Sequence, residues 1–378
     1  MKICYIADLG SIHTQRWVEW FAKRGHEVHI ISPREQQGAI GKNVYIHKPN
    51  IENCSSIVKK LPFKSRWIYT WLCIKIIKEI NPDIVHGHFI TDSGPPTIFS
   101  GNYPKLVSAW GSDVLVSPKN SFINKLILKY TLRNSDLILA ESEILKKEME
   151  LYENSLNIKV IPWGINIDMF NRVTDLNQDI KNLKSELALG DSPIIISTRP
   201  FSPVYSIDTV IEAIPIVTKE IPNAKFILKN FGKGLLFKEK MEDLAKNLNV
   251  SHHIMFVDEV EYNELPKYLN SSDIYVSTSL SDSCSVSMLE AMACGLPVVV
   301  SDEPSNLEWI KDGWNGYIFP RKDYEALAEK LIMLLKDKEK RKLFGKRNRE
   351  IIEERGDWDK NMEKVEQLYE NLINKYKI

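Results

Sequence analysis

The chain has 378 residues of ordinary globular usage, 43% hydrophobic and 26% charged, and its formal net charge is zero. This length predicts two domains rather than one core, and the balanced charge argues against nucleic acid as a partner. The five cysteines show no Cys-x-x-Cys spacing, which favours reduced, buried thiols over disulfides or a metal site. We find no secretory signal and no apolar run of membrane-spanning length, and therefore expect a cytoplasmic location.

Short apolar runs alternate with helical stretches through the first half of the chain. The runs lie at residues 2–7, 28–31, 84–86, 106–109, 137–140 and 160–161. Strands that alternate with helices predict a parallel sheet with right-handed crossovers. We therefore predict a doubly wound α/β domain over residues 1–170.

The second half repeats this alternation. Its apolar runs lie at residues 194–197, 226–228, 254–257, 274–276, 298–300 and 317–319. They predict a second doubly wound domain over residues 192–356. Residues 171–191 are polar without strong apolar periodicity, and we interpret them as a linker.

The loop after the first predicted strand reads Asp8-Leu9-Gly10-Ser11-Ile12-His13-Thr14 and leads into a helix. Gly10 permits unusual backbone angles, and Ser11 would face the cleft beside it. No GxGxxG pattern is present, which argues against a dinucleotide-binding dehydrogenase. His13 is either a contact to a substrate hydroxyl or phosphate, or a helix-start residue with local hydrogen bonds.

A segment near residues 59–78 combines lysine and arginine with Trp67, Tyr69 and Trp71. Basic residues mixed with aromatic ones suit an anionic membrane surface, which would make the protein peripheral on the inner face of the cell membrane. The alternative is a surface helix whose apolar side covers the sheet. Residues 122–130 form a second, weaker candidate.

Two further segments lie at the ends of predicted strands, at the edge where open α/β sheets bind ligands. One is His86-Gly87-His88 and the other is Trp110-Gly111-Ser112-Asp113. Trp110 offers a flat apolar face or an N–H donor. Asp113 either faces the cleft or caps the following segment. His86 and His88 end the third strand, and because no third metal ligand is identifiable, we predict a cleft-lining or structural role and no metal.

The most informative stretch is Asp282 to Pro297, which lies between two buried strands. Two carboxylates, Asp282 and Glu290, flank a run of mostly small residues at the start of a helix: Ser283, Cys284, Ser285, Val286 and Ser287. The small side chains let a ligand approach the backbone, and a helix N-terminus is a site for phosphate. The stretch therefore predicts a nucleotide-sugar pocket. The alternative is a capping box between Ser287 and Glu290.

The run from Glu290 to Val299, EAMACGLPVV, closely resembles the signature of retaining glycosyltransferases of family 4. The resemblance implies the GT-B fold, in which two Rossmann-like domains face an interdomain cleft and a C-terminal helix, here about residues 357–378, crosses back onto the first domain. It also implies that the first acid binds hydroxyls of the donor sugar and the second binds the ribose. Asp282 and Glu290 occupy these positions, and Asp282 is one methylene shorter than the usual glutamate.

The resemblance implies a further arginine and a lysine five residues later that hold the donor diphosphate. Arg199 is present, and its fork suits phosphate. Val204 stands at the lysine position and Tyr205, which brings no charge, follows it; Lys229 or Lys233 could supply the missing charge. By the same resemblance, the loop with Gly10 and His13 lies near the donor phosphates and the acceptor, and Trp110 replaces a histidine near the donor sugar.

These residues and the resemblance together predict a metal-independent transferase that moves a sugar from a nucleotide-diphosphate donor, with no further cofactor, to a glycan or lipid-linked acceptor; the resemblance implies that it is retaining. Arg199 and the helix dipole would stabilise the leaving diphosphate. Bacterial surface or capsular polysaccharide or glycolipid synthesis is the expected setting. Two alternatives remain open, a catalytically weak scaffold subunit of a glycan-assembly complex and a GT-B sugar epimerase. A two-lobed solute-binding protein is disfavoured because no export signal is found.

Overall fold

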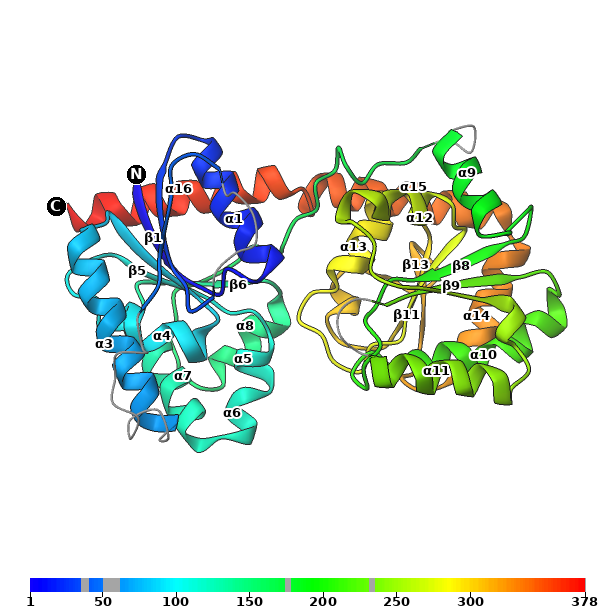
Figure 1. Cartoon of the computed structure of the whole chain (residues 1–378), viewed down its shortest axis with the longest axis horizontal. Coiled ribbons are helices and arrows are strands. Elements are labelled where there is room, and N and C mark those ends of the chain that lie inside the picture. Colours follow the sequence, from blue (N-terminus) through cyan, green and yellow to red (C-terminus); the bar gives the residue numbers. More distant parts are fainter. Residues whose placement is uncertain (35–40, 50–61, 174–177, 231–234, 378) are drawn as a thin grey trace. The chain divides into compact units, whose positions relative to one another are not determined.

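The computed structural model describes residues 1–34, 41–49, 62–173, 178–230 and 235–377. The chain divides into two compact units, each built around its own parallel sheet (Figure 1). Unit 1 comprises Met1–Pro162 and Met362–Ile378, and unit 2 comprises Trp163–Asn361. The prediction of two doubly wound α/β domains is confirmed.

Unit 1 has a seven-stranded sheet in the order β3-β2-β1-β4-β5-β6-β7, with every pair parallel. The strands are β1 (Lys2–Ile6), β2 (Glu27–Ile31), β3 (Val44–His47), β4 (Ile84–His88), β5 (Lys105–Ser108), β6 (Leu137–Ala140) and β7 (Ile158–Val160). All six predicted runs coincide with strands. The sequence analysis missed β3, an edge strand whose Tyr45 and Ile46 are exposed.

Helices follow most strands of unit 1 and cover its sheet. They are α1 (Ile12–Lys23), α3 (Pro62–Ile80), α4 (Ile90–Ile98), α5 (Ser112–Leu115), α6 (Ser117–Asn120), α7 (Phe122–Asn134) and α8 (Glu143–Glu150). The long α16 (Trp358–Tyr376) joins them, since its residues from Met362 onward belong to unit 1. Its Tyr369 is fully buried and stacks on Phe21 at 5.1 Å between ring centroids.

Unit 2 has a six-stranded parallel sheet in the order β10-β9-β8-β11-β12-β13. The strands are β8 (Ile194–Ser197), β9 (Lys225–Lys229), β10 (Ile254–Val257), β11 (Ile274–Ser277), β12 (Val298–Ser301) and β13 (Gly316–Phe319). Consecutive side chains of β8 enter different core clusters, Ile195 one and Ile194 and Ile196 the other. Because side chains alternate across a strand, the sheet is buried on both faces.

The helices of unit 2 surround this sheet. They are α9 (Gln178–Glu186), α10 (Ile207–Glu220), α11 (Leu235–Asn247), α12 (Leu265–Asn270), α13 (Val286–Ala293), α14 (Tyr324–Lys336) and α15 (Lys338–Arg355), with short 3₁₀ turns η2 (Ser251–His253), η3 (Tyr262–Glu264) and η4 (Asn306–Glu308).

The stretch at 171–191, which the sequence suggested as a linker, contains helix α9 and lies inside unit 2. Ile180 and Leu183 of this helix are buried, and α9 packs beside α12. Two apolar residues three positions apart are enough to dock one side of a short helix, although they leave little periodicity in the sequence. The boundary between the units falls instead after Pro162.

In each sheet the strand order reverses at one place, between β1 and β4 in unit 1 and between β8 and β11 in unit 2. Ligands of doubly wound sheets bind at the carboxyl ends of the strands beside such a reversal. The loops that carry Gly10 and Trp110 follow β1 and β5, and His88 ends β4. The loops that carry Arg199 and Asp282 follow β8 and β11. Each unit therefore presents one group of candidate residues at this edge.

Candidate functional site

In unit 2 the candidate residues gather around the guanidinium group of Arg199, whose residue is only 6% exposed. One terminal nitrogen donates to the hydroxyls of Ser285 and Ser287, each at 3.1 Å, and the other donates to Asp282 Oδ2 at 2.5 Å. The Nε–H has no acceptor among the residues that the structure describes. A buried, charged group with a spare donor is suited to an anionic ligand.

Tyr205 covers the guanidinium of Arg199 from one side. Its ring centroid lies 3.9 Å from Cζ of Arg199, within the range of a cation–π contact. Burial alone would lower the pKa of Arg199, but the carboxylate of Asp282, which also accepts a hydrogen bond from the guanidinium, outweighs burial and helps to raise that pKa above its ordinary value. The arginine therefore stays protonated, and Asp282 compensates its charge.

The start of helix α13 contacts this arginine. Ser285 is its N-cap residue, yet its side chain makes no capping hydrogen bond and instead accepts from Arg199. The start of the helix therefore lacks the side-chain acceptor that usually covers it, which leaves room for an anion.

The capping box considered as an alternative does not form. Helix α13 begins at Val286, so Ser287 lies inside it and Glu290 lies in its second turn, not its first. Ser287 bonds to the hydroxyl of Tyr275 at 2.8 Å and to Arg199. Glu290 Oε1 accepts from the hydroxyl of Tyr262 at 2.8 Å.

Three other residues predicted to bind the donor, Ser283, Cys284 and Val286, make contacts within the protein itself. Cys284 and the half-buried Val286 pack in or against the second core cluster, so their side chains belong to the core rather than to a donor surface. The backbone N–H of Ser283 donates to Asp282 Oδ1 at 2.9 Å, which holds that carboxylate in place.

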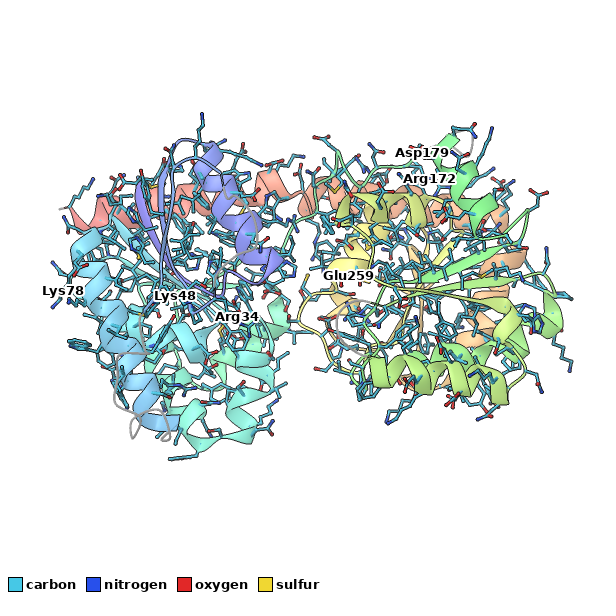
Figure 2. The ribbon with its side chains drawn as sticks, in the orientation of Figure 1. Arg34, Lys48, Lys78, Arg172, Asp179 and Glu259 are labelled. Carbon is cyan, nitrogen blue, oxygen red and sulfur yellow. The ribbon has the colours of Figure 1, made fainter. Side chains whose placement is uncertain are left out.

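A second buried cation lies at the same edge of the sheet. Lys229 ends β9 and is 4% exposed; burial lowers its pKa, while the carboxylates of Glu290 and Glu259 act in the opposite direction. Figure 2 labels Glu259, which follows β10 at this edge. Of the two lysines considered for the missing charge, Lys229 is thus near Glu290, and Lys233 lies outside the described residues.

In unit 1 the candidate residues line a cavity of about 510 Å³ at the carboxyl ends of β1, β4 and β5. Predicted residues at its wall are Ser11, His88 and Trp110. The sequence did not single out the charged residues around them, two pairs formed by Arg34 with Asp8 at 3.3 Å and Arg66 with Asp92 at 3.5 Å. Asp8 follows strand β1 and Arg34, which Figure 2 labels, follows strand β2, so both were accessible to the same reasoning, whereas Arg66 comes from helix α3.

His88 is the most unusual group of this cavity. The residue is 2% exposed, and neither ring nitrogen has a hydrogen-bond partner within the described part of the chain. Burial lowers the pKa of His88 to about 3, so the ring is neutral near pH 7. Its ring lies 5.3 Å from that of Trp110, which in turn meets the edge of His13 at 6.2 Å. Burial, followed by the charge of Arg16, lowers the pKa of His13 to about 3 as well.

Asp113 does not face this cavity and is fully buried. Its carboxylate accepts the backbone N–H groups of Ile90 at 2.7 Å and Trp110 at 3.0 Å, and so ties the loop after β5 to the start of α4. The structural alternative therefore describes Asp113 better than a place on the acceptor side, because its oxygens are used by the backbone.

We expected Gly10 to adopt unusual backbone angles, but it is not among the residues with positive φ. A Cβ at this position would lie 3.2 Å from Asp8 Oδ1 and 3.4 Å from Arg34 Cδ. The absence of a side chain at Gly10 keeps the loop close to this ion pair, and its N–H donates to Asp8 at 2.9 Å.

The described residues contain no cluster of three or more His, Cys, Asp or Glu side chains arranged to hold a metal ion. None of the helices in the described ranges has the length and apolar character that crossing a bilayer requires.

The fold and the site define a GT-B glycosyltransferase, and comparison with known families agrees. Residues 2–142 match the model described as "Glycosyl transferase 4-like", and residues 179–351 match "Glycosyl transferases group 1". The chain belongs to this family of glycosyltransferases, and the predicted resemblance to family 4 is confirmed.

Its relatives act on several substrates. The chain is 26% identical to the N-acetyl-alpha-D-glucosaminyl L-malate synthase of Bacillus anthracis, over 98% of this chain and 96% of that one. It is 21% identical to the alpha-monoglucosyldiacylglycerol synthase of Acholeplasma laidlawii, over 92% and 93%.

Solved structures share the fold at low identity. The sucrose-phosphate synthase of Thermosynechococcus elongatus superposes with a TM-score of 0.84 at 18% identity over 99% of both chains. The HepE protein of Anabaena, solved with UDP and glucose, superposes with a TM-score of 0.78 at 17% identity, over 98% of this chain and all of that one.

Proposed function

We propose that the protein is a retaining glycosyltransferase whose unit 2 binds a nucleotide-diphosphate sugar at Arg199 and the start of α13. The observation that carries the proposal is the buried Arg199 held between Asp282, Ser285 and Ser287, with Glu290 in the next turn of the helix. The charged fork, the uncapped helix start and two carboxylates provide the donor and acceptor groups that a diphosphate and two sugar rings require.

Donor binding would exchange the partners of Arg199. Without ligand, Asp282 neutralises the guanidinium. When a diphosphate binds the guanidinium of Arg199 in place of Asp282, the Asp282 carboxylate becomes free to accept hydrogen bonds from hydroxyls of the donor sugar. Glu290 then accepts a hydrogen bond from the ribose. The spare Nε–H of Arg199 adds one donor for the phosphate.

The reaction breaks the bond between the anomeric carbon and the diphosphate oxygen and forms a bond from that carbon to an acceptor hydroxyl oxygen on the same face. Negative charge develops on the leaving diphosphate, where Arg199 and the dipole of α13 stabilise it without a metal ion. The leaving phosphate takes up the proton of the acceptor hydroxyl, so the charges balance.

The acceptor would occupy the cavity of unit 1. His88 offers an unpaired neutral ring nitrogen to a hydroxyl, and Trp110 offers an aromatic face for a sugar. The relatives named above make a sugar-malate conjugate and a glycolipid, and so support a hydroxyl-bearing acceptor, either a glycan or a lipid-linked one. Surface polysaccharide or glycolipid synthesis is the setting that we propose.

A catalytically weak scaffold subunit is the second candidate. Val204 and Tyr205 occupy the place of the family's second phosphate-binding cation, and the remaining Arg199 is paired with Asp282. A site with one compensated arginine would hold a diphosphate less tightly than a site with two free cations.

Calorimetric titration with UDP, GDP, dTDP and ADP, and with their sugar conjugates, tests the donor site on wild type and on Glu290→Ala. We expect one nucleotide to bind and Glu290→Ala to weaken it at least tenfold. Turnover of the matching sugar conjugate with an acceptor distinguishes a transferase from a scaffold, which binds without consuming the donor. Absence of binding by every nucleotide to the folded protein would overturn the transferase proposal.

We further propose that unit 1 contacts an anionic membrane through an aromatic patch on α3, α4 and α7. The sequence pointed to residues 59–78, of which 59–61 lie outside the described residues. The patch consists of Trp67, Trp71, Phe99, Phe122, Leu126 and Tyr130, all of them exposed. The three helices lie next to one another (Figure 1), and Phe99 links Trp67 to Tyr130 with ring centroids 6.1 and 5.6 Å apart.

The charges that helix α7 contributes beside this patch are of one sign. Helix α7 carries Lys125, Lys129 and Arg133 and no acidic residue. Exposed aromatic side chains beside lysine and arginine fit the interface of a bilayer with negatively charged lipids. A soluble partner protein would also cover apolar side chains, but it would not explain the positive charge of α7 as directly.

Sedimentation with phosphatidylglycerol vesicles tests this surface. The variant Trp71→Gln/Phe122→Gln is expected to bind at least tenfold more weakly than wild type, because two large aromatic groups no longer enter the interface. Tyr45→Gln/Leu151→Gln is the matched control, since both residues are exposed in unit 1 but outside the patch. Equal binding to uncharged phosphatidylcholine vesicles, or equal loss in the control, would contradict a role for the patch in anionic lipid binding.

A further inference from the structure

Unit 2 contains a cavity of about 670 Å³ at the amino ends of its strands. Asp273 precedes β11 and Pro297 precedes β12, and both line this cavity. Because all strands of the sheet are parallel, it lies at the opposite end from Arg199, which follows β8. Figure 2 labels both Arg172, near α9, and Glu259, at the carboxyl edge, and shows them at separate places in unit 2.

The wall of this cavity is strongly basic. Its volume is within the range of small-molecule sites. Among the described residues, seven basic side chains line it, and Asp273 and Glu350 are the carboxylates. The basic residues are Arg172, Lys184, Lys338, Arg341, Lys342, Lys346 and Arg349. They come from the segment before α9, from α9 itself and from α15, so the tertiary fold assembles them.

Two of these residues form a rigid base. Arg349 donates to the backbone carbonyls of Ile167, Phe170 and Ala293, at 2.8 to 3.2 Å from one terminal nitrogen. Arg341 donates to two carbonyls at the end of α14, at 2.6 and 2.7 Å. Carbonyl partners fix both guanidinium groups and leave their positive charge in place.

Ion pairs compensate only part of the positive charge. Arg341 lies 3.7 Å from Asp273 and Lys346 lies 3.8 Å from Glu350, while Lys342 and Arg349 pair with Glu339 and Glu353. Three cations, Arg172, Lys184 and Lys338, form no ion pair with any residue in the described ranges. Like charges held around one cavity raise its electrostatic potential and attract an anion.

We propose that this cavity is a binding site for a small molecule that carries two or more phosphate groups, separate from the donor site. Several converging lysine and arginine groups match the multiple oxygens and charges of such a ligand better than those of a single carboxylate. The half-buried Lys184 and the anchored Arg341 and Arg349 would contact the phosphates, and Arg172 and Lys338 would close over them from the rim.

Titration calorimetry with pyrophosphate at low salt tests the site in the whole protein. Because the donor site would also take up pyrophosphate, Arg199→Gln serves as the background. We expect this variant to bind one equivalent, and the added changes Lys184→Gln and Lys338→Gln to weaken that binding at least tenfold. Lys181→Gln with Lys311→Gln is the matched control, since both lysines are exposed and neither lines the cavity.

The outcomes separate this site from the donor site. Loss of all pyrophosphate binding in Arg199→Gln alone, or an equal loss in the control, would overturn the proposal. Lys184→Gln/Lys338→Gln on the wild-type background should leave nucleotide binding at the donor site unchanged, so failure here and failure of the transferase proposal are distinct. Vesicles that contain a lipid with two or more phosphate groups distinguish the source of the phosphate, because Lys184→Gln/Lys338→Gln reduces sedimentation with them only if the ligand is a lipid headgroup.

Discussion

Arg199 is almost completely buried, and its neighbours compensate its charge in three ways. Asp282 supplies the opposite charge, two serine hydroxyls accept its N–H groups, and Tyr205 presents the face of its ring. Each contact also limits where the guanidinium can move. Precise placement of this group would matter for a diphosphate, because its fork must meet two oxygens at once.

Changing Tyr205 to leucine tests the contribution of the ring. A cation–π contact contributes about 0.5 to 2 kcal/mol, so Tyr205→Leu should weaken binding of the preferred nucleotide by roughly 2- to 30-fold. Tyr205→Phe keeps the ring and should bind within about twofold of wild type. Calorimetry measures both, and equal losses in the two variants would assign the effect to the hydroxyl instead.

Asp113 provides a test that depends on pH. Burial raises the pKa of Asp113 from its ordinary 3.8 to about 6. Between these values the folded protein holds a proton that the unfolded chain has released, so this group stabilises the fold at low pH and loses that effect as the pH rises through 6. Above pH 6 the buried charge persists.

The comparison with Asp113→Asn isolates this effect, because asparagine does not titrate. The free energy of unfolding of wild type, relative to the variant, should fall by up to about 3 kcal/mol between pH 4 and pH 6.5. Urea unfolding at several pH values measures the difference. Parallel curves for the two proteins across this range would show that the pKa of Asp113 is not raised.

At the scale of single residues, the sequence located the candidates but not their contacts. Arg199, Asp282 and Glu290 were recognised by their places in a motif, and the structure puts the first two in direct contact. Cys284 was assigned to the donor site, and for Asp113 a place in the cleft and a capping role were both open; both residues are buried. Spacing along a loop shows which residues are near a strand end, but not which way each side chain points.

At the scale of elements, Tyr369 of α16 forms a buried hydrogen-bond network with the rest of unit 1. The hydroxyl of Tyr369 lies 2.5 Å from His86 Nδ1 and 3.3 Å from the hydroxyl of Tyr5, and Trp17 Nε1 donates to it at 3.4 Å. All of these groups are buried. The contacts join residues more than 280 positions apart along the chain.

Removing this hydroxyl should destabilise unit 1. Tyr369→Phe leaves buried polar atoms without their partner, which costs about 1 to 3 kcal/mol in the free energy of unfolding. Tyr376→Phe on the same helix is the control, since its half-exposed hydroxyl bonds to Asp136 at 2.7 Å and its loss should cost less than about 1 kcal/mol. Urea denaturation measures both, and similar losses would indicate a general effect of α16 rather than of the buried network.

Elements with a buried apolar run were predicted from the sequence, and those held by long-range contacts were not. All twelve predicted runs correspond to strands, whereas β3 at the sheet edge and α9 in the supposed linker were missed. Helix α13 was predicted, but its start was not, because the capping pattern at Ser287 competes with hydrogen bonds from Arg199 and Tyr275. Tertiary partners decided that competition.

At the scale of the whole molecule, each unit has its own sheet and core clusters. A nucleotide bound to unit 2 should therefore stabilise that unit most. At a nucleotide concentration 100 times its Kd, the free energy of opening should rise by about 2.7 kcal/mol. Hydrogen exchange should slow chiefly around residues 196–206 and 277–291. Protection confined to the loops of unit 1 would place the nucleotide there and contradict the donor assignment.

The sequence by itself determined the two doubly wound units, the family and the carboxyl-edge loops that carry the site, because strand periodicity and a contiguous motif are local properties of the chain. The tertiary structure decided what depends on distant residues meeting. Examples are the pairing of Arg199 with Asp282, the cavity that joins Arg66 to His88, and the basic cavity formed by α9 and α15. Charges and hydrogen bonds act over a few ångströms in space, so their partners follow from the packing of elements and not from their order.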